Sequence, residues 1–145
     1  NEDRDPGCEA KVKMPGEVDL QKLIKDMKPE LNSGEYVYCL VDSKEDAAGL
    51  DPLCYFIETE GVTVILPKEK ADSLNLPYAT TFAWITLTVH SSLEAVGLTA
   101  AVSRSLTEAN ISCNVIAAFH HDHIFVPIKD AERAMNELQK LTNNI

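Results

Sequence analysis

Histidine side chains are grouped in the second half of this chain, where they could bind a metal or line a pocket. The four histidines are His90, His120, His121 and His123. Imidazole nitrogens, together with a carboxylate such as that of Asp122, are donors that zinc and other transition metals accept. Because neighbouring residues of a hairpin alternate between its faces, His121 and His123 should point together and His120 away. Two ligands on one face are too few for a metal site. We therefore predict that no metal is bound and that these histidines are structural or line a pocket.

No catalytic pattern is found in the same region. Ser91 follows His90, but adjacency in sequence does not make a catalytic pair, and the chain has no G-x-S-x-G elbow. Cys113 lies in an apolar run and should be inert, and no glycine-rich phosphate loop is present. We therefore predict a protein that is not an enzyme and needs no cofactor. The alternative is a metal-dependent enzyme or metal carrier that uses His90, His121 and His123.

The loops that carry the polar groups belong to a pattern that occurs twice. Residues 41–50 and 89–98 share the frame V-x-S-x-x-x-A-x-G-L, and V-I-L-P at 64–67 is echoed by I-F-V-P at 124–127. Two echoes in the same order favour a duplicated unit. The frames lie 48 residues apart (43 to 91) and the prolines 60 apart (67 to 127). The first copy therefore lacks about a dozen residues, or roughly three turns, of the helix after the frame.

A binding site for a small zwitterion is predicted where the second frame enters its helix. We expect a helix over 93–109 with Ser92 as its N-cap. Free amide groups in the first turn, the helix dipole and the two serine hydroxyls would hold a carboxylate. Carboxylates and an amide oxygen nearby would accept from an ammonium group. The predicted ligand-binding residues are Asp42, Ser43, Ser91, Ser92, Glu94, Ala95, Val96, Gly97, Asn114 and Asp122.

Two simpler interpretations of these residues stay open. Ser91 and Ser92 would cap the helix without any ligand if the first turn faces only solvent. Asn114 stands on an otherwise apolar strand, and its amide would then satisfy neighbouring backbone groups at the strand end.

Composition limits the partners of the chain. A net charge of −10 and a pI of about 4.7 disfavour nucleic acid and anionic membranes, which reward clustered Lys and Arg. No apolar run approaches the ~18 residues of a membrane span. The four cysteines lack zinc-site spacing, which predicts reduced thiols and a cytoplasmic protein.

Hydrophobic periodicity predicts the elements that position these residues. A helix capped by Asp19, a strand over 36–41, a hairpin over 53–66 and a short helix over 68–74 come first. A strand over 83–89, the helix over 93–109, a hairpin over 113–128 and a helix capped by Asp130 follow. Trp84, on the outer face of its strand, packs on the sheet or forms a subunit interface. The helix over 93–109 should be covered twice, because a second apolar arc is made by Leu93, Val96, Gly97 and Ala100.

This order predicts an α+β fold of two ferredoxin-like units derived from a βαββαβ plan and packed side by side. The first unit has a shortened crossover helix. We expect a flexible tail over 1–17, the first unit over 18–78 and the second over 79–145. The plan leaves a unit without its last strand, which must then come from the other unit or from another chain.

The block W-I-T-L-T-V-H-S-S-L-E-A-V-G-L-T-A-A-V at 84–102, with I-S-C-N-V-I-A at 111–117 and H-D-H-I-F-V-P at 121–127, resembles small tandem ACT-domain proteins. The resemblance covers most of residues 19–141. It implies regulatory ferredoxin-like modules that commonly bind amino acids at the interface between paired modules. The usual ACT loop carries Asp followed by Pro-Gly, whereas these loops read S-S-L-E-A-V-G and S-K-E-D-A-A-G. Ligand contacts are therefore not transferred from the family.

These observations together predict a non-enzymatic regulatory protein that binds a small molecule, an amino acid, between its two units. Open sheet edges and the doubly apolar helix predict a homodimer. The alternative is a scaffold that kept the fold without a ligand.

Overall fold

The computed structural model describes residues 16–144 of the chain. Of the tail predicted over 1–17, residues 1–15 lie outside the described residues, as does Cys8. Glu17 is held by backbone hydrogen bonds to the loop that follows Val89. Its amide donates to the His90 carbonyl over 2.8 Å, and the Ser92 amide donates to the Glu17 carbonyl over 3.1 Å.

The first unit has the elements and the short crossover helix that the sequence predicts. Its elements are β2 (Tyr36–Val41), α3 (Lys44–Gly49), β3 (Cys54–Ile57), β4 (Val62–Pro67) and α4 (Lys68–Ser73). The Ser43 hydroxyl caps α3 by accepting from the Asp46 amide over 3.1 Å. Ser43 is the serine of the first repeated frame, over 41–50. Helix α3 is therefore formed by the residues of that frame.

The second unit has a longer crossover helix. Its elements are β5 (Thr81–Leu87), α5 (Leu98–Glu108), β6 (Asn114–Ala117), β7 (Asp122–Pro127), the 3₁₀ turn η1 (Ile128–Asp130) and α6 (Ala131–Asn143). The predicted hairpin and final helix are confirmed. The Asp130 side chain does not cap α6; it instead accepts from Arg133 Nη1 over 2.8 Å.

The predicted start of the crossover helix at residue 93 is wrong, because α5 begins only at Leu98. Gly97 stands before it in the left-handed region, at φ 105°, and this conformation cannot continue a helix. The Ser92 hydroxyl accepts from the Glu94 amide within a local turn, so Ser92 is not a helix cap. Leu93 and Val96 are 65% and 82% exposed, and no second apolar helix face exists there.

The two units share strands within one antiparallel sheet. Its order is β3-β4-β2-β5-β7-β6, and β1 (Pro29–Leu31) also pairs with β5. The start of β5 pairs with β2 through Phe82 and Tyr36, and so supplies the fourth strand of the first unit. At the other end of β5, Leu87 pairs with Pro29 of β1. The strand that the second unit lacks is thus provided by β1, which precedes β2 in the chain.

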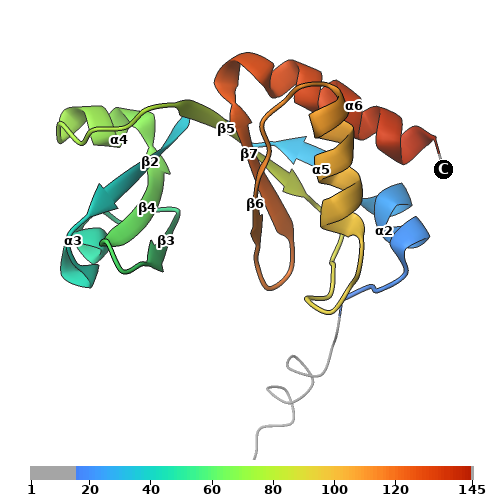
Figure 1. The fold of residues 1–145 in the computed structure, drawn as a ribbon, viewed down its shortest axis with the longest axis horizontal. Helices are drawn as coiled ribbons and strands as arrows, with labels where there is room; N and C mark the ends of the chain where they lie inside the picture. The colour runs from blue at the N-terminus through green and yellow to red at the C-terminus, as the bar shows by residue number, and fades with distance from the viewer. Residues whose placement is uncertain (1–15, 145) are drawn as a thin grey trace, which may run out of the picture.

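Helices cover only the outer faces of this curled sheet (Figure 1). The larger core lies under α5, α6 and α2 (Leu20–Asp26), the last of which is capped by the predicted Asp19 side chain. The smaller core lies between the first unit's strands and helices α3 and α4. Alternation along β2, β5 and β7 then sends every second side chain to the opposite, inner face of the sheet.

The inner faces of the two units meet in a cluster of aromatic rings. Tyr36 and Tyr38 of β2 contact Phe125 of β7 at ring-centre distances of 6.4 and 5.8 Å, although β2 and β7 are not neighbours in the sheet. Trp84 of β5 completes the cluster, 5.5 Å from Tyr36 and 6.5 Å from Phe125. The cluster joins the two halves along the line where β2 and β5 pair.

Candidate functional site

A groove opens beside the aromatic cluster, between the inner faces of the two units. Its outer part has a volume of about 530 Å³. β3 and β6 both line it. They are the two ends of the sheet order, so within residues 16–144 each has one edge without a strand partner. The side chains along it are Tyr38, Cys54, Tyr55, Phe56, Glu58, Thr63, Ile65, Cys113, Asn114, Val115 and Ile116.

A smaller hollow of about 130 Å³ continues this groove toward β5 and shares Cys54 and Ile116 with it. The hollow is apolar except for one imidazole. Its walls are Leu53, Cys54, Trp84, Ile116, Ala118, His123 and Phe125. Apolar cavities of about 150 Å³ accept compact hydrocarbons such as benzene, so the hollow has the size of an apolar side chain.

A hydrogen-bond chain fixes the imidazole in that wall. Trp84 Nε1 donates to His123 Nδ1 over 3.0 Å, and Thr86 Oγ1 lies 3.1 Å from the same nitrogen. Thr86 in turn accepts from Asn32 Nδ2 over 2.9 Å. An indole N–H can only donate, so Nδ1 is an acceptor and neutral His123 carries its proton on Nε2. Burial, and then the neighbouring His121, lowers the pKa of His123 and favours this neutral form.

Polar groups are sparse along the rest of the groove. Glu58 is the one charged side chain among the lining residues, and it accepts a hydrogen bond from the Thr63 hydroxyl. Asn114 Nδ2 donates to the Phe125 carbonyl over 3.2 Å, which is the backbone-satisfying role that the sequence left open. Burial raises the pKa of the Cys54 and Cys113 thiols and disfavours reactive thiolates.

The ten ligand-binding residues predicted from the sequence lie in four places. Asp42 and Ser43 stand at the start of α3, on the opposite side of the molecule from the loop under α5 that carries residues 91–97 (Figure 1). Asn114 lines the groove. Asp122 is buried where β7 begins, and this burial raises its pKa. The two frames therefore do not face one another.

The groove residues that sequence reasoning missed had one usable signal. Tyr36 and Tyr38 alternate with buried residues on β2, as Phe82 and Trp84 do on β5. Aromatic residues on one face and aliphatic residues on the other predict a strand that is covered on both sides.

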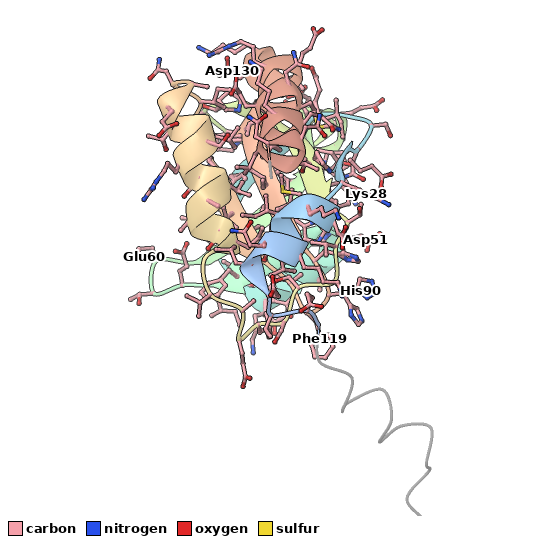
Figure 2. All side chains as sticks on the ribbon, turned by 90° about the vertical axis from the view of Figure 1, so that its right-hand side faces the viewer. Lys28, Asp51, Glu60, His90, Phe119 and Asp130 are labelled. Atoms are coloured by element: carbon pink, nitrogen blue, oxygen red, sulfur yellow. The ribbon has the colours of Figure 1, made fainter. Side chains whose placement is uncertain are left out.

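The four histidines lie together at one end of the second unit. Ring centres are 5.3 Å apart for His90 and His120, 4.8 Å for His90 and His121, and 6.3 Å for His121 and His123. The prediction that His120 points away from the others is therefore wrong, because the turn after β6 brings it to His90. Figure 2 shows His90 and Phe119 at this end of the molecule. Within residues 16–144, no group of three His, Cys, Asp or Glu side chains is arranged to hold a metal ion.

Comparison with known families agrees with this architecture. Family models described as ACT domain match residues 15–83 and 80–140. The chain belongs to the ACT-domain family. It is a tandem ACT-domain protein, and the two matches overlap where β5 begins, the strand that both domains use.

Solved structures with the same fold include one close relative. A protein of unknown function from Vibrio cholerae, described as a possible transport protein, is 46% identical and has a TM-score of 0.78; the match covers 85% of this chain and 95% of that one. A protein from Agrobacterium tumefaciens is 13% identical over 79% of this chain and 87% of its own, with a TM-score of 0.62. The regulatory subunit of aspartate kinase from Thermus thermophilus is 9% identical over 78% and 95%, with a TM-score of 0.54. The last two show the fold alone.

A comparison with curated proteins returns no match. Across residues 16–144, no helix combines the length and the apolar character needed to cross a membrane.

Proposed function

We propose that this regulatory ACT protein is not an enzyme and that it binds an amino acid in the groove between its two ACT domains. The observation that carries the proposal is the groove itself, which is built from the inner faces of both domains and ends in an apolar hollow. A ligand that contacts both walls would stabilise one arrangement of the two domains over others. Ligand binding would regulate the protein through this change in the populations of its conformations.

The chemistry of the walls supports an amino acid with an apolar side chain. The hollow between Trp84, Ile116 and Phe125 would take the side chain. Glu58 is an acceptor for the ammonium group at the outer part. Edge strands keep one row of backbone amides free, so β3 and β6, with His123 Nε2–H, offer donors to the carboxylate. Charged side chains would find no counter-charge in the hollow and would be excluded by the cost of burial.

A thermal-shift panel of the twenty amino acids tests this function. A ligand at 100 times its Kd adds about 2.7 kcal/mol to the unfolding free energy, and we expect a rise of several degrees in Tm for apolar amino acids only. Glu58→Gln should weaken the response, whereas Glu60→Gln, in the same turn but outside the groove lining, should leave it unchanged. Absence of any shift at millimolar concentrations would contradict the proposal.

We also propose that the protein is a homodimer joined through exposed apolar residues at the histidine end. Leu93 and Val96, which the sequence placed on a second helix face, lie in the loop before α5 and are exposed. Val18 and Phe119 are 57% and 65% exposed. Glu17 and the His120 carbonyl are both hydrogen-bonded to this loop, which places these side chains near it. Apolar residues exposed together in this way are typical of an interface.

Sedimentation velocity at micromolar concentration should show a dimer. Val96→Asp is expected to convert it to monomer, because each dimer would bury two unpaired carboxylates. Leu74→Asp, a substitution of another exposed apolar residue at the end of α4, is the matched control and should remain dimeric. A monomeric wild-type protein would contradict the dimer and leave the groove proposal unaffected.

A further inference from the structure

The only tryptophan of the chain is bonded to the histidine cluster. Trp84 stands in the wall of the hollow, and its indole N–H donates to His123 Nδ1 over 3.0 Å. The ring centres of the two side chains are 5.7 Å apart. His123 connects to the remaining three histidines through His121, at 6.3 Å. A single side chain therefore reports on both the groove and the cluster.

The bond from Trp84 exists only while His123 is neutral. A protonated imidazole carries N–H groups on both nitrogens and has no lone pair left to accept with. Trp84 Nε1 and Thr86 Oγ1 both lie within hydrogen-bond distance of His123 Nδ1. A proton on Nδ1 would place its N–H donor against the indole N–H, which is also a donor. Protonation must therefore break the contact and release the indole from its position in the groove wall.

We propose that His123 is a proton-operated latch on Trp84: neutral His123 holds the indole in the wall of the hollow, and protonated His123 releases it and weakens binding in the groove. The effect on binding rests on the function proposed above, whereas the effect on Trp84 does not depend on any ligand.

The groups around His123 determine the pH at which its imidazole is protonated and Trp84 is released. His121 faces it from the turn between β6 and β7, and Cys54 from β3 lines the same hollow. Trp84 and Thr86 on β5 do not titrate in this range. Asp122 precedes His123 on β7 but belongs to the opposite, helix-covered face. Burial and His121 both lower the pKa of His123, so release occurs below the ordinary histidine value of about 6.5.

His121 makes the Trp84 contact more resistant to acid. The pKa of His121 is itself lowered by burial and then by His90 and His120. A positive charge on His121 opposes a proton on His123. Removing His121 should therefore move release of Trp84 to higher pH.

Trp84 fluorescence of the full chain, recorded between pH 8 and pH 4.5, tests the latch. We expect a reversible change with its midpoint below pH 6.5, while far-ultraviolet circular dichroism stays constant. His121→Gln should shift the midpoint upward, and His123→Gln should abolish the transition. A titration of the histidine ring protons by NMR gives the same midpoint for His123 without any substitution that could affect folding. A flat fluorescence profile, or a transition that survives His123→Gln, would overturn the proposal.

Two further measurements distinguish the latch from its rivals. With an amino acid from the thermal-shift panel, Kd should rise by about tenfold for each pH unit below the midpoint, because only the neutral state is competent to bind. If the panel yields no ligand, the proposed function fails and the Trp84 titration still decides the latch. Zinc chloride at pH 7.5 should leave the fluorescence unchanged. Saturation by one equivalent of zinc would assign the cluster to a metal and overturn the proposal.

Discussion

Phe125→Ala is expected to lower the unfolding free energy by about 3–5 kcal/mol, the usual cost of deleting a buried aromatic ring. Phe125 is 1% exposed, and its ring packs between both domains, against Tyr36 and Tyr38 on one side and Trp84 on the other. The cavity left behind would lie where the two domains meet along the pairing of β2 with β5, so we expect both domains to lose stability together. Urea unfolding followed by circular dichroism measures the loss.

Phe56→Ala is the matched control for this substitution. Phe56 lies on β3 and is largely exposed, so its removal should change the unfolding free energy by no more than about 0.5 kcal/mol. A second unfolding transition in Phe125→Ala, with the first domain at wild-type stability, would mean that the aromatic cluster does not couple the domains. A loss below 1 kcal/mol would mean that the two inner faces are not packed on one another.

Gly97→Ala and Gly49→Ala should change stability in opposite directions, although the two glycines hold the same position in the repeated frame. Gly97 has φ 105°, a conformation that costs a residue with a Cβ roughly 1–2 kcal/mol. A Cβ there would also meet Leu20 Cδ2 at 3.0 Å. Gly49 ends α3 with open space around it, and alanine should add about 0.4–1 kcal/mol by restricting the unfolded chain.

The Tm of each variant, measured by thermal unfolding alongside the wild-type protein, checks both predictions. Each variant is the control for the other, because both substitutions add one methyl group to the same sequence frame. Equal effects of the two substitutions would show that the loop before α5 is helical, as the sequence predicted, and that the left-handed turn at Gly97 is not formed.

Local sequence signals were sufficient to predict secondary structure wherever residues close in the chain determine the backbone conformation. Asp19 caps the helix that it was predicted to cap, since a side-chain cap involves only the next three residues. The strands and both hairpins follow from alternating apolar residues and turn-forming residues. The short crossover helix of the first domain follows from counting residues between repeated frames.

The same frame failed in the second domain for a physical reason. An apolar pattern at helical spacing extends back to Leu93, but Gly97 adopts a left-handed turn that packs against Leu20 of α2. Leu20 is distant in sequence, so nothing local to the frame predicts this turn. Because no helix begins at Ser92, the predicted anion site is not formed there. Asp42 and Ser43 lie in the other domain, at the start of α3.

The sequence by itself determined the fold class, the duplication and the absence of catalytic patterns, because these depend on residue types and on spacing over a few turns. Only the tertiary structure decided that β1 completes the second domain, that the two inner faces enclose a groove, and that the four histidines meet at one end of the second domain. Each of these depends on which strand lies beside β5 and how far the sheet curls. Such pairings join Pro29 to Leu87 and Glu17 to Ser91, and their contact free energies appear only once the chain has closed on itself.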